Sequence, residues 1–254
     1  NAIIGENRLL TGDQAGITRD SISLNWKYRG KNISLIDTAG QRRKSKIQDK
    51  VENISVSDAW RYVKQSHVVV LVMDIHHPLE KQDITIARKA FNEGKIIIFA
   101  LNKSDSVSNA EEIQKDVERR VRYEFSQLVG VPCLLVSAKK KLGLARIFNK
   151  AFELHDKWNI RVPTSSLNKW FQWAVSQNPP PLVNGMPIKL KYISQTNIKP
   201  PTFAVFANRS EHLPASYEKY LINSLRKSFD FDGIPLRIFI RQRDNPYAKE
   251  SSKR

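Results

Sequence analysis

The chain has 254 residues, 41% of them hydrophobic, which is enough to bury the core of one large domain or of two ordinary ones. Its 42 Lys and Arg against 25 Asp and Glu give a formal net charge of +17, so we expect polyanionic partners, nucleic acid ahead of an anionic membrane. We expect no membrane span and no signal peptide. The single Cys133 excludes an internal disulfide framework, and its apolar neighbours predict a buried strand position.

Short β-rich runs alternate with helical patterns over the first two-thirds of the chain. Strands are predicted at 21–28, 32–37, 67–74, 95–102 and 132–138, and helices at 51–64, 84–92, 110–128 and 144–158. The later strands are continuous apolar runs with helical stretches between them. This rhythm is typical of an α/β fold, in which a mainly parallel sheet is covered on both faces and ligands bind at the carboxyl ends of the strands.

The alternation stops at Pro163, and a different order of elements follows. A helix beginning at 164 carries Trp170 and Trp173, whose helical spacing predicts core positions. Strands at 187–194 and 201–208, a helix at 214–229 and a strand at 235–243 complete an α-β-β-α-β order. We therefore expect two domains, 1–160 and 161–254. The second is a small α+β domain with the denser charge, since it has 14 Lys and Arg and 6 Asp and Glu from residue 164 onward.

Three short motifs each follow an apolar strand: DTAG at 37–40, NKSD at 102–105 and SAK at 137–139. Each is weak alone, but the three in this order form a strong constellation. Guanine presents N1–H and its exocyclic amine side by side, and the carboxylate of Asp105 can accept hydrogen bonds from both. Adenine offers an acceptor at that ring position and would leave the carboxylate unpaired, so the motifs predict a preference for GTP over ATP.

Other residues of these two loops suit other parts of the same nucleotide. Asn102 can bridge to the base edge and tie the loops together, and the alkyl stem of Lys103 can lie over the purine and ribose. In the loop that begins at Ser137, the backbone amide of Ala138 suits guanine O6, and Lys139 covers the face of the base opposite Lys103.

The DTAG motif serves the phosphate end of the nucleotide. Asp37 can hold a Mg²⁺-bound water, and the Gly40 amide can approach the γ-phosphate because no Cβ obstructs it. Thr18, in a loop upstream, can reach Mg²⁺ and the γ-phosphate only while that phosphate is present, which is how a switch loop is ordered and released.

The chain resembles the EngA (Der) family of bacterial GTPases over essentially its whole length. The resemblance rests on AGITRDSI, DTAGQRRK, LNKSD, VSAKKKLGL, RVPTSSLNKW, PPPLVNG, PPTFAVFAN and IPLRIFIRQRDNPY. It implies the second G domain of that family, a Ras-like P-loop GTPase domain, followed by a KH-like domain. It further implies GTP hydrolysis to GDP in assembly of the large ribosomal subunit, in the cytoplasm and at the ribosome. Mg²⁺ and often K⁺ are the implied ions, and rRNA and a preceding G domain are the implied partners.

The KH-like segment has no G-x-x-G loop, so we do not expect ordinary KH clamping of nucleotides. Its basic residues are expected to touch the rRNA backbone or the partner G domain. The candidates, which alternate along strands so that one face is basic, are Lys189, Lys191, Arg237, Arg241 and Arg243.

Gln41 is a departure from the family, where the residue after DTAG is usually hydrophobic. Its position matches that of the glutamine of Ras-like proteins, so our hypothesis is that Gln41 orients the attacking water, with Thr18 and Gly40 as the other catalytic candidates. His76 and His77 are adjacent on a strand-exit loop without further ligands nearby in the sequence, so we expect a surface loop rather than a metal site.

No G-x-x-x-x-G-K-[ST] phosphate loop occurs in the 254 residues. We expect this loop, and the first strand of the sheet before it, to lie upstream of Asn1, so that the chain is a piece of a GTP-hydrolysing switch protein. Two alternatives stay open. The chain could begin at Asn1 and serve as an RNA- or ribosome-binding module without phosphate binding, or it could be an Era-like GTPase, which the missing G-x-x-G disfavours.

Overall fold

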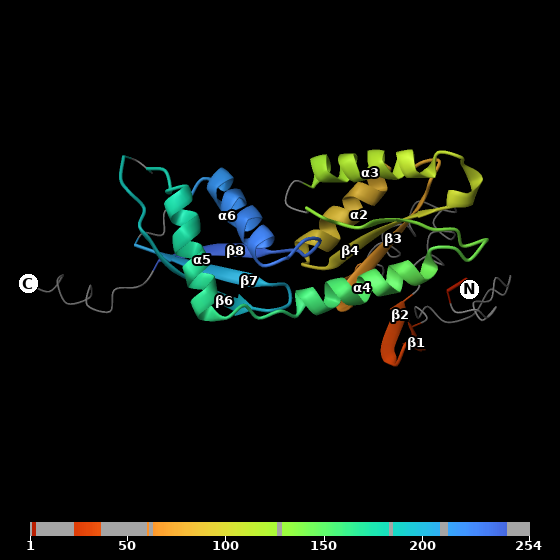
Figure 1. Cartoon of the computed structure of the whole chain (residues 1–254), viewed down its shortest axis with the longest axis horizontal. Coiled ribbons are helices and arrows are strands. Elements are labelled where there is room, and N and C mark those ends of the chain that lie inside the picture. Colours follow the sequence, from red (N-terminus) through yellow and green to blue (C-terminus); the bar gives the residue numbers. More distant parts are fainter. Residues whose placement is uncertain are drawn as a thin grey trace, which may run out of the picture.

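The computed structural model describes residues 2–3, 23–36, 60, 63–125, 129–182, 185–208 and 213–242. Two halves lie side by side along the long axis of the molecule (Figure 1). The N-terminal half contains β1 (Ser23–Tyr28), β2 (Lys31–Ile36), β3 (Val68–Asp74), α2 (Lys81–Asn92), β4 (Ile96–Asn102), the 3-10 turn η2 (Ser104–Ser106), α3 (Ala110–Glu124), β5 (Cys133–Leu135) and α4 (Leu144–Trp158). The C-terminal half contains α5 (Thr164–Gln177), β6 (Leu190–Asn197), β7 (Thr202–Ala207), α6 (Ala215–Ser228) and β8 (Arg237–Gln242).

Strands β3, β4 and β5 form a parallel sheet with β4 in the middle. The residues from Ile96 to Leu101 in β4 are 0% exposed, which is why this strand reads as an unbroken apolar run. Ile97 and Phe99 pack with residues of α2 and α3, whereas Ile98 and Ala100 pack with residues of α4. Helices α2 and α3 lie on one side of this sheet and α4 on the other (Figure 1). The expected parallel sheet covered on both faces is confirmed, and so is the buried strand position of Cys133.

Strands β1 and β2 form an antiparallel hairpin closed by a two-residue turn. Both turn residues have positive φ, 47° at Arg29 and 81° at Gly30, as the tight turn of a twisted hairpin requires. Trp26 and Tyr28 each place their ring centroid 5.1 Å from that of Phe148 in α4. These ring contacts hold the hairpin against α4.

The C-terminal half follows the expected α-β-β-α-β order. Its central strand β7 pairs antiparallel with β6 and parallel with β8, and α5 and α6 pack on one face of the sheet (Figure 1). Trp170 is buried as expected, but Trp173 is 53% exposed, so the core position expected for it is wrong. The buried stripe of α5 repeats at the helical spacing of Leu167, Trp170, Phe171 and Ala174, and position 173 falls outside it.

The two halves share one hydrophobic core. Ile98 of β4 and Leu154 and Trp158 of α4 belong to the same buried cluster as Phe203 and Phe231 of the C-terminal half. Burial of each such side chain contributes about 1.5 to 3 kcal/mol to folding, so the join between the halves is part of the core rather than a loose contact. No helix in the described part of the chain is long and apolar enough to cross a membrane.

Glycines allow the backbones of the two halves to approach closely. A Cβ at Gly94 would lie 2.4 Å from Cγ of Pro200, and one at Gly130 would lie 2.8 Å from Cβ of Asp232. Polar contacts cross the same boundary: the Gly233 N–H donates to the Val129 carbonyl at 2.8 Å. Beside it, Lys157 Nζ lies 2.8 Å from a carboxylate oxygen of Asp230.

We expect Gly94→Ala to lower the free energy of unfolding by about 2 to 4 kcal/mol, because the new methyl group must displace the rigid ring of Pro200. Gly185→Ala is the matched control. Gly185 has the same φ of +74° as Gly94, but no described residue lies within 4 Å of its ideal Cβ, so only the cost of the left-handed conformation, about 1 kcal/mol, should appear. Urea unfolding measures both, and equal losses would contradict the close contact.

Candidate guanine-nucleotide site

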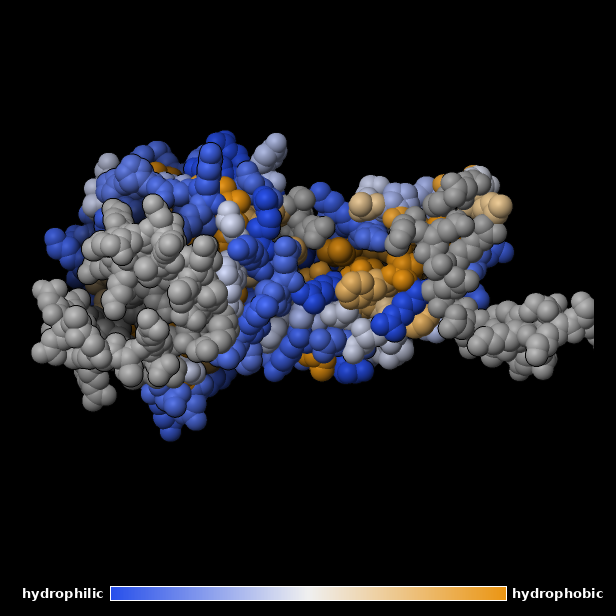
Figure 2. Space-filling model, turned by 180° about the vertical axis from the view of Figure 1, so that it is seen from behind, coloured by the Kyte–Doolittle hydropathy of each residue, from blue (hydrophilic) through white to orange (hydrophobic). Residues whose placement is uncertain are grey.

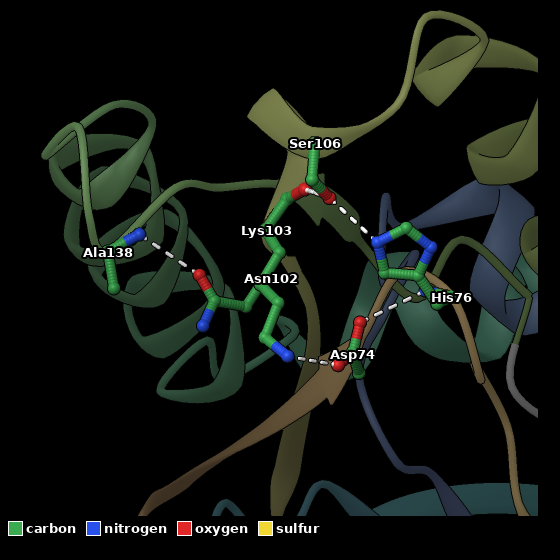
Figure 3. A network of polar contacts seen from close by, with 6 residues as sticks. All are labelled: Asp74, His76, Asn102, Lys103, Ser106 and Ala138. Atoms are coloured by element: carbon green, nitrogen blue, oxygen red, sulfur yellow. Dashed lines mark hydrogen bonds and ion pairs between the residues drawn. The ribbon is translucent and has the colours of Figure 1, made fainter.

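Polar side chains meet where β3 and β4 end, beside the loop that follows β5 (Figure 3). The parallel register pairs Asp74, the last residue of β3, with Asn102, the last residue of β4. The Ile75 N–H donates to the Asn102 carbonyl at 3.0 Å, which continues this pairing into the loop. The NKSD and SAK loops therefore lie at one edge of the sheet.

Asn102 joins these two loops directly. Its side-chain Oδ1 accepts a hydrogen bond of 3.0 Å from the backbone N–H of Ala138 (Figure 3). A second link runs from the Ser104 N–H to the Val136 carbonyl at 3.1 Å. The amide expected to face guanine O6 is thus engaged with Asn102, so a contact with O6 requires this amide to be shared between two acceptors.

The pKa of Asp105 is influenced by Ser137, the first residue of the SAK loop. A hydrogen bond from the Ser137 side chain is the largest cause that lowers the pKa of Asp105 below its ordinary value, and Lys140 and Lys139 act in the same direction. Ser137 is itself buried, and its Oγ accepts a hydrogen bond from the Lys140 N–H at 3.0 Å. The carboxylate is therefore kept ionised, as an acceptor for paired donors must be.

The SAK loop closes through a short backbone bridge. Ser137 and Leu142 exchange two hydrogen bonds, of 2.9 and 3.0 Å. The next residue, Gly143, has φ +74°, and a Cβ there would lie 2.3 Å from the Leu135 carbonyl oxygen. Only glycine fits this position, and the turn it permits presents Ala138 and Lys139 at the surface, where both are exposed.

Lys103 has a left-handed backbone, with φ 64° and ψ 29°. Its Nζ lies 2.5 Å from a carboxylate oxygen of Asp74 (Figure 3). That hydrogen bond is the largest cause that lowers the pKa of Asp74. The ion pair directs the lysine stem across the ends of β3 and β4. Asp74 was missed in the sequence, although its place at the end of an apolar strand next to the NKSD strand is a signal that could have found it.

His76 supports the same network from the β3 side. Its backbone N–H donates to Asp74 Oδ1 at 3.1 Å, and its Nε2 lies 2.8 Å from Ser106 Oγ (Figure 3). Because the Ser106 hydroxyl donates to the Lys103 carbonyl at 2.6 Å, the proton in the His76–Ser106 bond belongs to Nε2. His76 and His77 are both exposed. Within the described ranges, no group of three or more His, Cys, Asp or Glu residues could hold a metal ion.

The phosphate-end candidates lie outside the described residues. These are Thr18, Asp37, Gly40 and Gln41. Arg243, near the C-terminal end of the chain, also lies outside the described residues. Of the other basic candidates, Lys189, Lys191 and Arg241 are exposed. The guanidinium of the half-buried Arg237 donates to the Asn92 carbonyl at the end of α2, so this side chain contacts the N-terminal half.

Comparison with known proteins agrees with this geometry. Residues 1–103 match the family described as 50S ribosome-binding GTPase, and residues 161–241 match the KH-domain-like C-terminal region of EngA bacterial GTPase enzymes. GTPase Der of Parvibaculum lavamentivorans is 42% identical over 253 residues, which cover 100% of this chain and 54% of that protein. The chain is similar to EngA (Der) proteins over its whole length. Its fold is a Ras-like GTPase domain followed by a KH-like domain.

Other relatives give the same coverage. GTPase Der of Brucella anthropi is 41% identical over 254 residues, 100% of this chain and 53% of that protein. The chain thus spans about half the length of the curated relatives it matches. A crystal structure of Era in complex with MgGDPNP and nucleotides 1506–1542 of 16S ribosomal RNA has a TM-score of 0.48 and 12% identity, covering 96% of this chain and 88% of that one.

Removal of the Ser137 hydroxyl should raise the pKa of Asp105. We expect Ser137→Ala to move this pKa toward its ordinary value because the main hydrogen bond that stabilises the ionised form is lost. Carbon-13 NMR titration of the Asp105 carboxyl group measures the change. Ser106→Ala is the control, since Ser106 bonds to Lys103 and His76, and it should leave the Asp105 titration unchanged.

Proposed function

We propose that this chain provides the guanine-recognising and RNA-facing parts of a GTP-hydrolysing switch protein that acts in assembly of the large ribosomal subunit. The observation that carries the proposal is the joined pair of loops: Asn102 Oδ1 accepts a hydrogen bond from the Ala138 N–H, and the Ser104 N–H donates to the Val136 carbonyl. Similarity to the EngA (Der) proteins supports the rest. The proposed domains are 1–160 for the GTPase domain and 161–254 for the KH-like domain.

Base recognition depends on Asp105. Its ionised carboxylate is an acceptor only, so it can take hydrogen bonds from N1–H and the exocyclic amine of guanine together. Adenine would leave this carboxylate facing a ring acceptor, which costs the site an unpaired charge. The stem of Lys103, directed by Asp74, would cover the ring face, and Lys139 would approach from the SAK side.

The phosphate end is proposed from the sequence. Thr18 and Asp37 would hold Mg²⁺, which neutralises phosphate charge when bound, and the Gly40 amide would meet the γ-phosphate. Gln41 would orient the attacking water, and K⁺ is a further proposed ion. We place the protein in the cytoplasm and at the ribosome, with the large subunit, rRNA and a preceding G domain as its partners.

Asp105→Asn should exchange guanine for xanthine specificity. Xanthine carries a carbonyl where guanine carries its amine, so a carboxamide can accept from N1–H and donate to that oxygen. We expect GDP affinity to fall by about a hundredfold or more and XDP affinity to rise, measured by titration with fluorescent nucleotides. Asp116→Asn, on the exposed side of α3, is the matched control and should bind GDP as the wild type does. A variant at 105 that keeps its GDP preference would contradict the proposed base site.

Gln41→Leu should slow GTP hydrolysis with little change in GTP affinity, because water orientation is needed only in the chemical step. Single-turnover hydrolysis, measured in whichever form of the protein hydrolyses GTP, gives the rate. Gln48→Leu is the control for loss of an amide nearby in the sequence. An unchanged rate in the Gln41 variant would remove this residue from the mechanism.

A further inference from the structure

The sheet of the C-terminal half has a second face, opposite α5 and α6. The strand register places its side chains in two adjacent rows, one of Tyr192, Phe206 and Arg241, and the other of Ser194, Ala204 and Phe239. The alternating residues Ile193, Val205 and Ile240 belong to the core on the helix side. We call the side opposite the helices the aromatic face.

Aromatic rings of this face are accessible. Phe239 is 51% exposed, and Tyr192 and Phe206 are half-buried. The rings of Tyr192 and Phe206 stack on each other, with centroids 4.4 Å apart and an angle of 14° between their planes. Figure 2 shows the molecule from behind, with hydrophobic residues gathered on the surface of the C-terminal half and hydrophilic residues around them. An exposed phenylalanine next to an ordered ring pair is a candidate contact surface.

The charge around these rings is positive. Strands β6, β7 and β8 contain no Asp or Glu, and they contribute Lys191, Arg237 and Arg241. Arg241 lies in the same row as Phe206, and both Arg241 and Lys191 are exposed. Arg237 is engaged with the Asn92 carbonyl, so among the described basic residues of these strands Arg241 lies on this face and is left for a ligand. Lys191 lies at the irregularity between Leu190 and Tyr192 on β6, at the edge of the face.

Rings with cations beside them suit single-stranded nucleic acid. Its unpaired bases can stack on aromatic side chains, and each nucleotide brings a phosphate that can meet Arg or Lys. A duplex keeps its bases stacked inside and cannot use the rings. A protein segment would have to supply acidic groups at matching positions to neutralise Arg241 and Lys191, so the charge favours RNA over a protein partner.

We propose that the aromatic face binds two or three nucleotides of single-stranded RNA, with a base stacked on Phe239 and phosphates contacted by Arg241 and Lys191. This binding mode uses the sheet surface and not a G-x-x-G loop, which the chain lacks. This inference extends the proposed function. It also rests on it, because the proposed function is what makes rRNA available as the ligand.

Fluorescence anisotropy of a fluorescein-labelled oligouridylate of about ten nucleotides, titrated with the 254-residue chain at one salt concentration, tests the proposal. We expect Phe239→Ala to weaken binding about tenfold and Phe239→Tyr to restore it, since a tyrosine ring stacks as well. Arg241→Gln should also weaken binding and reduce the slope of log affinity against log salt by about one.

Trp173→Ala is the matched control. Trp173 is 53% exposed, close to the 51% of Phe239, but it lies on α5, so its loss should leave RNA affinity unchanged. Equal RNA affinities of wild type and Phe239→Ala would overturn the proposal. A duplex RNA of the same length that binds as tightly as the single strand would also overturn it.

Fluorescent GDP binding by the same preparations separates this inference from the proposed function. A chain that binds GDP but no single-stranded RNA defeats the aromatic-face proposal alone. A chain that binds RNA through Phe239 but no GDP supports the aromatic face, and the nucleotide site is then tested in a form of the protein that has the phosphate loop, which the 254 residues lack. An unchanged far-UV circular dichroism spectrum of Phe239→Ala shows that this variant is folded, so that its loss of RNA affinity supports the proposal.

Discussion

Strand β4 is the element on which both the candidate site and the join between the halves depend. Its residues from Ile96 to Leu101 have no exposed surface, because helices cover both faces and neighbouring strands lie along both edges. One face packs with α2 and α3, and the other reaches the core shared with the C-terminal half. The strand ends at Asn102, where the loops of the site meet. A displacement of β4 would therefore move the site and the join together.

The sequence predicts most of this because burial leaves a simple pattern. A strand covered on both faces must be apolar at every position, so β3 and β4 are visible as continuous runs. Motifs that follow parallel strands must meet at one edge of the sheet, and the NKSD and SAK loops do so. The helix α4 is visible from its amphipathic spacing, and its bounds match the expected 144–158.

Individual contacts between distant segments were not predictable, even where one of the residues could have been singled out. The ion pair of Asp74 with Lys103 requires the parallel register that sets Asp74 beside Asn102, and neither residue alone indicates it. Trp173 is also a tryptophan and follows Trp170 by three residues, but it is not among the α5 residues that are buried against the sheet. The shared core forms only when the two folded halves meet, so the periodicity of a single segment does not predict it. Local patterns predict elements, whereas the contacts among elements decide their details.

The approach of Gly94 to Pro200 has a consequence for how the sequence can vary among relatives. A side chain at position 94 becomes acceptable only when the residue at position 200 becomes smaller or its turn moves away, since the two occupy one volume. The two positions belong to different halves of the molecule and lie far apart in the chain. They should nevertheless change as a coevolving pair, so that substitutions in one half limit those accepted in the other.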